Sequence, residues 1–372
     1  MSNLAKLDRR EFLKATGITG GGLVLSMSFG CQPSGEPMAE TAVAPNVYVN
    51  LREDDVVEIY CHRSEMGQGI RTSLPQVIAD ELEADWDRIE LIQAPGDARY
   101  GNQNTDGSTS IRQQFDLLRT AGASAREMLI AAAASSWSVP ASELTARQHA
   151  IHHEASGRSA SYGELVATAA KLELPENVSF KDPADYRYIG KPMDLIDGIA
   201  MTTGTAMYGI DTDVPDMLHA SIERCPVVGG TLRSLDESAA LAVAGVKQVV
   251  RMPEPTSPPL YNPLGGVAVL ADNTWSAQEG RAALAIEWDT GLNAEYDSAA
   301  YREDLVETSH AAGNAVLNRG DVDAAFESAA SVIEADYYAP HLSHAPMEPP
   351  SATARMTEDG GCEVWTCTQD PQ

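Results

Sequence analysis

A strand, a glycine-bearing turn, a helix and a second strand follow one another between residues 56 and 93. Residues 56–62 alternate in the way of a strand, as do residues 46–50 before them. After the turn, apolar residues share one helix face: Leu74, Val77, Ile78 and Leu82. A strand over 89–93, a polar loop and a second amphipathic helix over 111–129 follow. This order predicts an α/β unit.

The turn that precedes the first predicted helix is a candidate binding site. Gly67 and Gly69 flank Gln68 there. Glycine lets backbone N–H groups approach a ligand closely, and a helix N-terminus favours an anion. The turn is therefore suited to a cofactor that carries a pyrophosphate, and an ordinary tight turn is the alternative. The third glycine of a nicotinamide fingerprint is absent from the required place.

The polar loop over 104–110 is expected to open the second helix as the turn opens the first. Its backbone and hydroxyl groups would add donors for an anion, and a simple helix cap is the alternative. The candidate binding residues of this loop are Thr105, Gly107, Ser108 and Thr109. Beyond the second helix, residues 137–180 predict a connector with one short helix over 162–172.

Composition limits the partners of the chain. The net charge of −28 would repel nucleic acid and anionic membrane surfaces, so neither is expected as a partner. With 372 residues, of which 43% are hydrophobic, the chain has room for two or three domains with real cores. The five cysteines show neither a metal-type cluster nor the spacing of a disulfide framework.

The first 44 residues are predicted to be a targeting signal with a linker rather than a folded domain. Arg9 and Arg10 precede a weakly hydrophobic, glycine-rich run over 15–30, which resembles a twin-arginine export signal. Cleavage after 42–44 is expected, with a lipid anchor at Cys31 as the alternative. The expected location is the periplasm. Because the twin-arginine pathway exports folded proteins, a redox protein with a large cofactor is favoured.

The rest of the chain predicts small sheets and helices. Between 184 and 290 the pattern gives four strands, over 218–223, 246–251, 266–271 and 283–288. A helix over 236–242 and another capped by Asn273 lie among them. The last segment predicts further elements, which are a helix over 322–329, a strand over 332–338 and a hairpin of 352–356 with 362–368.

Taken together, these segments resemble the large subunit of the molybdenum hydroxylases, the xanthine dehydrogenase and aldehyde oxidase family. The stretch 66–69 is similar to the family's segment that wraps the pterin dinucleotide, and the Thr105 loop to its companion phosphate-contacting loop. Residues 184–290 resemble the family's a/b hammerhead domain, with Asp211 and Trp275 in register. The position of the turn near the start of the chain is similar to the isoquinoline 1-oxidoreductase branch.

The resemblance implies a mixed α/β (α+β) fold, in which a hammerhead domain is flanked by pieces of a molybdopterin-binding domain. The resemblance implies four segments. A signal and linker occupy 1–44, and the first part of the molybdopterin-binding domain with its connector occupies 45–183. The hammerhead occupies 184–290, and a linker with the start of the main molybdopterin-binding domain occupies 291–372.

The resemblance also implies an activity. The family hydroxylates an aldehyde or an N-heteroaromatic compound with oxygen drawn from water, using molybdenum–molybdopterin, here expected as the cytosine dinucleotide. Gln369 matches the glutamine that donates a hydrogen bond to the apical oxo group of the metal, although a surface glutamine is the alternative. Electrons would pass to iron–sulfur clusters on a small partner subunit and on to a cytochrome c.

The resemblance places two parts of the family pattern later in the family's chain than the segment that ends at Gln369. They are the glutamate of a Gly-x-x-Glu loop, which serves as general base, and a Gly-Gly-Gly-Phe-Gly loop for the cofactor. We therefore expect a fragment, a truncated product, or a split subunit whose partner chain carries the remaining half. The alternative is an inactive scaffold or assembly module.

Overall fold

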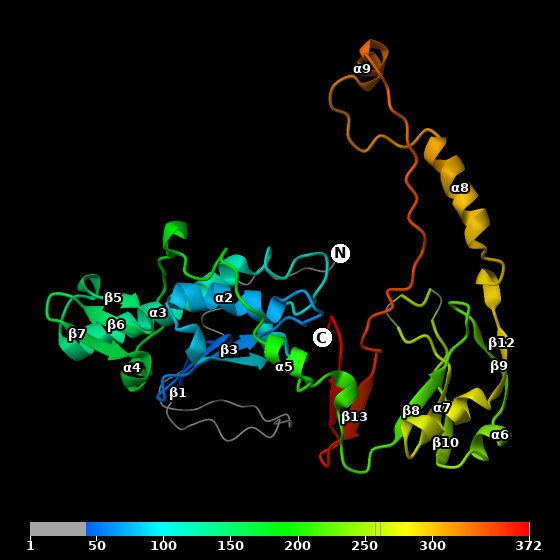
Figure 1. Ribbon diagram of the computed structural model, residues 1–372, viewed down its shortest axis with the longest axis horizontal. Helices are drawn as coiled ribbons and strands as arrows, with labels where there is room; N and C mark the ends of the chain where they lie inside the picture. Colours follow the sequence, from blue (N-terminus) through cyan, green and yellow to red (C-terminus); the bar gives the residue numbers. More distant parts are fainter. Residues whose placement is uncertain (1–41, 257, 261, 372) are drawn as a thin grey trace. The chain divides into compact units, whose positions relative to one another are not determined.

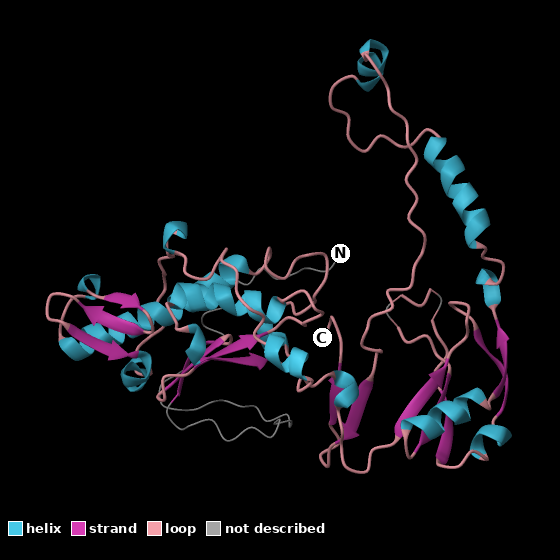
Figure 2. Cartoon of the chain, in the orientation of Figure 1, coloured by secondary structure: helices cyan, strands magenta, loops and turns pink. Residues whose placement is uncertain are grey.

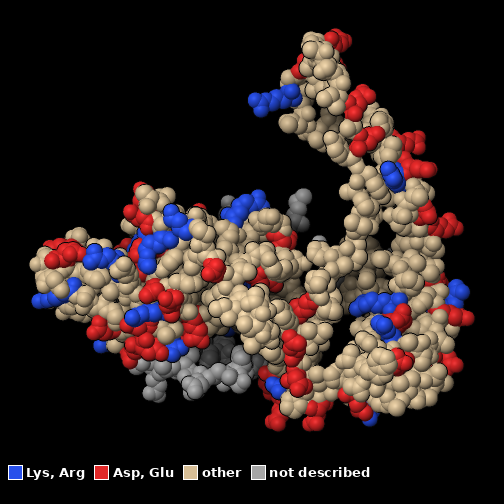
Figure 3. Space-filling view, viewed as in Figure 1, with Lys and Arg blue, Asp and Glu red and all other residues tan. Residues whose placement is uncertain are grey.

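The computed structural model describes residues 42–256, 258–260 and 262–371. The predicted twin-arginine signal and Cys31 lie outside these residues. The chain divides into two compact units, which are Met1–Thr212 with Glu348–Gln372, and Asp213–Met347. The domain limits derived from the sequence stay predictions. Figure 3 shows Asp and Glu side chains on the visible face of both units.

The first unit is built on a sheet with the order β1 (Ala42–Asn46), β2 (Val49–Arg52), β3 (Val57–Cys61) and β4 (Ile89–Gln93). The pairs β1–β2 and β2–β3 are antiparallel, whereas β3 and β4 are parallel. A parallel pair needs a crossover connection, and α2 (Ile70–Leu82) provides it. The predicted order of strand, turn, helix and strand is confirmed (Figure 1).

Two further helices cover this core. α3 (Phe115–Trp137) packs against α2, and α4 (Tyr162–Ala169) packs against α3. A Cβ added to Gly122 of α3 would lie 2.4 Å from the carbonyl oxygen of Ile78 on α2, so only glycine permits this close approach. Buried side chains of the sheet and helices form one cluster, which includes Val49, Ile59, Leu74, Ile78, Leu118 and Leu129.

Buried carboxylates of α2 fasten both α3 and the segment around 181–189 to this helix. Glu81 pairs with Arg119 at 2.7 Å and with Arg126 at 3.1 Å. Asp80 accepts from Lys181 Nζ at 2.6 Å and from three backbone N–H groups, those of Arg187, Tyr188 and Ile189. Burial raises the pKa of Asp80, but these hydrogen bonds outweigh it and the pKa lies below its usual range.

A small sheet occupies part of the predicted connector. It is formed by β5 (Thr145–Arg147), β6 (Ala150–His153) and β7 (Arg158–Ser161), so the prediction of a connector with only one helix is wrong. The three strands are so short and polar that no alternating pattern marks them. The predicted helix of this region is confirmed as α4, whose N-cap Ser161 forms a capping box with Glu164.

The second unit contains two small antiparallel sheets (Figure 2). One has the order β10 (Val246–Arg251), β11 (Val267–Ala271) and β8 (His219–Glu223). The other pairs β9 (Thr231–Asp236) with β12 (Ala285–Asp289). The helices that accompany them are α6 (Ser238–Leu241) and α7 (Thr274–Ala282). The predicted cap is confirmed, because Asn273 Oδ1 accepts from the N–H of Ser276 at 2.9 Å.

Residues 291–347 are exposed throughout. They contain α8 (Ser298–His310), which the sequence pattern missed, and α9 (Val322–Ser328), which it predicted. The predicted strand over 332–338 is wrong. A strand requires a neighbour for its backbone hydrogen bonds, and no described strand pairs with this segment.

The remaining α-helix and strands belong to the first unit. They are the short helix α5 (Gly198–Thr203) and the hairpin of β13 (Ala352–Met356) with β14 (Cys362–Thr366), which was predicted and is confirmed. None of the described helices combines the length and hydropathy that a membrane span requires. The predicted mixed α/β class is confirmed, whereas the hammerhead assignment stays a prediction.

Candidate cofactor-binding site

The glycine turn holds an anion supplied by its own chain. Glu65 Oε1 accepts from the N–H groups of Gly67 at 2.8 Å and Gly69 at 2.9 Å, and Oε2 accepts from that of Arg71 at 3.0 Å. Gly69 is the N-cap of α2, and both glycines have positive φ, 88° and 83°. Three donors at a helix N-terminus therefore converge on one carboxylate, as they would on a phosphate.

Gln68 braces the same turn. Its Oε1 accepts from the N–H of Met66 at 2.6 Å, and its Nε2 donates to the carbonyl of Ser64 at 3.2 Å. The side chain is exposed, so it stands at the surface of the site rather than in the core. Sequence reasoning identified Gln68 and its glycines but missed Glu65. A carboxylate two residues before the first glycine was the signal available.

The Thr105 loop and Gln369 bind each other directly. The N–H of Thr105 donates to the Gln369 carbonyl at 2.8 Å, and Gln369 Nε2 donates to the Thr105 carbonyl at 2.7 Å. Ser64 joins both to the glycine turn, because its N–H donates to Thr105 Oγ1 at 3.0 Å and its Oγ to the Thr368 carbonyl at 2.6 Å. Three segments far apart in the sequence thus meet around Ser64.

The rest of the polar loop forms an exposed tight turn. Thr109 donates to the carbonyl of Asp106 through its N–H at 3.0 Å and its Oγ1 at 2.7 Å. Gly107 and Ser108 have left-handed backbones, with φ of 52° and 57°. A right-handed helix cannot include such residues, and α3 begins further on, at Phe115. The expectation that this loop directly opens the second helix is wrong.

Two basic residues lie buried directly before the turn. His62 is 1% exposed and Arg63 is 0% exposed, and neither side chain has a hydrogen-bond partner among the described residues. The His62 ring lies 5.1 Å from that of Tyr48. Burial and the neighbouring Arg63 charge lower the pKa of His62 to about 4, so the imidazole is neutral near pH 7. Sequence reasoning missed both residues.

These residues fit a group that carries phosphate. The N–H donors of the turn converge on an anion, the Glu65 carboxylate. Two residues before Glu65 lies the buried Arg63, whose guanidinium has no acceptor among the described residues. Within the described part of the chain, no three His, Cys, Asp or Glu side chains are grouped so as to hold a metal ion.

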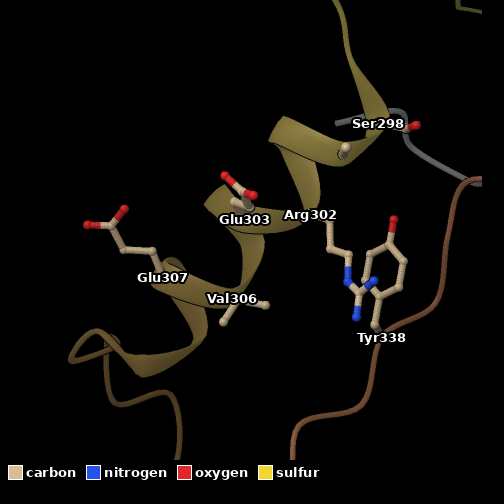
Figure 4. Close-up of a pocket in the computed structure, with 7 residues that line it drawn as sticks. Ser298, Arg302, Glu303, Val306, Glu307 and Tyr338 are labelled. Atoms are coloured by element: carbon tan, nitrogen blue, oxygen red, sulfur yellow. The ribbon is translucent and has the colours of Figure 1, made fainter.

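A separate pocket lies on the second unit, between α8 and Tyr338. Figure 4 shows Arg302 beside the Tyr338 ring, and its guanidinium carbon lies 4.9 Å from the ring centre. The pocket is lined by Ser298, Ala299, Arg302, Glu303, Val306, Glu307 and Tyr338. None of the predicted binding residues is among them.

Comparisons with known proteins address the identity of the chain. Two family models, both described as a molybdopterin cofactor-binding domain, match residues 4–219 and 306–372. Isoquinoline 1-oxidoreductase subunit beta of Brevundimonas diminuta is 33% identical, over 98% of this chain and 52% of that protein. A membrane-bound aldehyde dehydrogenase [pyrroloquinoline-quinone] of Gluconacetobacter polyoxogenes is 30% identical, over 87% of this chain and 42% of that protein.

A solved structure, the aldehyde oxidoreductase of Desulfovibrio gigas, is 23% identical with a TM-score of 0.35, covering 55% of this chain and 27% of that chain. The chain spans about half the length of the curated relatives it matches. The first family model alone covers more than half of the chain. The chain therefore belongs to the molybdopterin cofactor-binding family of the molybdenum hydroxylases, as the resemblance predicted.

Proposed function

We propose that this chain is part of the large subunit of a molybdenum hydroxylase that acts on an aldehyde or an N-heteroaromatic compound. The observation that carries the proposal is the meeting of the Gln68 turn, the Thr105 loop and Gln369 around Ser64. The names of two relatives, an isoquinoline oxidoreductase and an aldehyde dehydrogenase, support the two substrate classes.

The proposed cofactor is molybdenum–molybdopterin as the cytosine dinucleotide. When bound, it supplies the metal centre at which the substrate is hydroxylated with oxygen from water. The turn at Gly67–Gly69 and the loop residues Thr105, Gly107, Ser108 and Thr109 would hold its phosphate groups, which would compete with Glu65 for the N–H donors of the turn. Gln369 Nε2 donates one of its two hydrogens to the Thr105 carbonyl, and the other hydrogen can be donated to the cofactor.

The proposed partners follow from what the reaction needs. Electrons would leave through iron–sulfur clusters on a small subunit and pass to a cytochrome c. The general base and the remaining cofactor loop would come from residues beyond these 372, on the same or another polypeptide. Export by the twin-arginine pathway to the periplasm is part of the proposal, with lipid attachment at Cys31 as the alternative.

A second candidate is an inactive module that no longer takes a cofactor. The occupation of the turn by Glu65 favours it, because the three N–H donors are already satisfied. In this case the chain would act as a scaffold or assembly factor.

Isotope labelling tests the proposed reaction. The chain would be co-expressed with a polypeptide carrying the family's remaining half and with an iron–sulfur subunit, in a host that makes the cofactor. The complex would then be assayed in H₂¹⁸O with an aldehyde and with an N-heteroaromatic substrate. Incorporation of ¹⁸O into one product is expected. Turnover without label from water would contradict hydroxylation, and an assembled complex that contains no molybdenum and shows no turnover would favour the inactive module.

A further inference from the structure

Arg63 is a buried cation that follows β3. Its side chain is 0% exposed, and all three guanidinium nitrogens lack a hydrogen-bond partner among the described residues. Removing a cation from water is costly unless it is paired, so buried charges are as a rule paired. Among the described residues, Arg63 is therefore a buried charge that still calls for an acceptor.

Other buried cations of the same unit are paired. Arg119 and Arg126 both contact Glu81, and Lys181 contacts Asp80. The fold thus provides carboxylates for the cations that hold its elements together. Arg63 differs from them, which indicates that its acceptor is a bound group rather than a residue of this core.

Arg63 also lies where the predicted site elements converge. It follows β3 and directly precedes Ser64, which hydrogen-bonds to Thr105 and Thr368. Arg63 is therefore joined through its neighbour Ser64 to the Thr105 loop, whose residues 106–108 are exposed.

We propose that Arg63 is the charged anchor for a phosphate group of the ligand that binds at the Gln68 turn and the Thr105 loop. The inference deepens the proposed function and rests on it. Glu65 already uses the donors of the turn, so a phosphate needs another source of positive charge. The planar guanidinium presents five N–H donors, and the non-bridging oxygens of the pyrophosphate bridge in a dinucleotide can accept from them.

Thermal unfolding of the full chain tests this assignment, with inorganic pyrophosphate as the probe at constant ionic strength. Pyrophosphate is expected to raise the Tm of the wild type. Arg63→Met should raise the Tm of the ligand-free chain, because it removes an unpaired buried charge, and should weaken pyrophosphate binding at least about tenfold. Arg88→Met is the matched control, since Arg88 is half exposed and already pairs with Asp55, and it should leave pyrophosphate binding unchanged.

Three results would overturn the assignment. They are no pyrophosphate shift in the wild type, an equal shift produced by acetate, and an Arg63→Met variant that loses ligand-free stability but keeps its shift. Molybdenum content of the co-expressed complex separates this inference from the proposed function. Arg63-dependent pyrophosphate binding without molybdenum in any preparation would leave the anion site standing and remove the proposed function. Equal molybdenum content in the wild type and in Arg63→Met would leave the proposed function standing and remove Arg63 as the phosphate anchor.

Discussion

At the residue scale, the decisive feature is a carboxylate in a place suited to phosphate. Glu65 closes the turn by accepting from the N–H groups of Gly67, Gly69 and Arg71. The same contacts stabilise the start of α2 and compete with any external anion. Sequence reasoning found the turn because its glycines are visible in the pattern. It missed Glu65 and Arg63 because their roles depend on side-chain positions that only the folded chain fixes.

Glu65→Ala should have opposite effects on stability and on binding. Loss of the capping carboxylate should lower the free energy of unfolding by about 1 kcal/mol. The freed N–H groups should then bind pyrophosphate more tightly. Calorimetric titration checks the second effect and urea unfolding the first, with the exposed Glu176→Ala as control. Weaker pyrophosphate binding in Glu65→Ala would show that Glu65 does not compete for the site.

Substitutions of Gln68 and Gln369 should have different effects in a cofactor-loaded complex. Gln68→Ala removes both side-chain hydrogen bonds that brace the turn, so it should lower cofactor content. Gln369→Ala keeps the bond between its carbonyl and the Thr105 N–H, so it should leave content unchanged and slow turnover. Pterin dinucleotide content and kcat check the pair. Wild-type content and rate in both variants would remove both residues from the site.

At the element scale, α2 is fixed at both ends by different means. Its start is capped by Glu65, and near its end Asp80 and Glu81 bind the segment around 181–189 and α3. The helix was predictable, because its apolar face repeats with helical period. The partners of its charged residues were not, since Lys181 and Ile189 lie about a hundred residues further along the chain.

Asp80→Asn should destabilise the first unit by about 3 kcal/mol at pH 7, because it removes the charge that Lys181 faces in the core. The folded-state pKa of Asp80 is lowered, so its stabilisation is present above the unfolded pKa of about 3.9 and is lost as pH falls through the folded value. Urea unfolding at pH 7 and below pH 4 checks this, with the exposed Asp87→Asn as control. A difference between wild type and variant that does not shrink in acid would contradict it.

At the scale of the whole molecule, the sequence predicted individual elements better than their associations. The alternation over 89–93 coincides with β4, and the hairpin of β13 and β14 was found from its turn residues. The sheet of β5 to β7 was missed because its strands are three or four residues long. The strand over 332–338 failed because alternation alone does not supply a neighbouring strand.

The candidate site was predictable only in part. Its three segments were identified by their resemblance to the family, whereas no spacing in the sequence indicates that Gln369 hydrogen-bonds to Thr105. That contact is tertiary, and Ser64 hydrogen-bonds to both segments, at Thr105 and at Thr368. The assignment of these residues to a cofactor site stays a prediction, and the structure adds how their segments are joined.

Molybdenum content tests the central claim, that these segments form part of a cofactor site. The chain would be purified alone and with a polypeptide carrying the family's remaining half, from a host that makes the cofactor. Metal and extractable pterin dinucleotide would then be measured in both preparations. We predict molybdenum and dinucleotide in equal amounts in the co-purified pair, and a marked loss of both in its Gln68→Ala variant. A stable pair that contains neither would contradict the account.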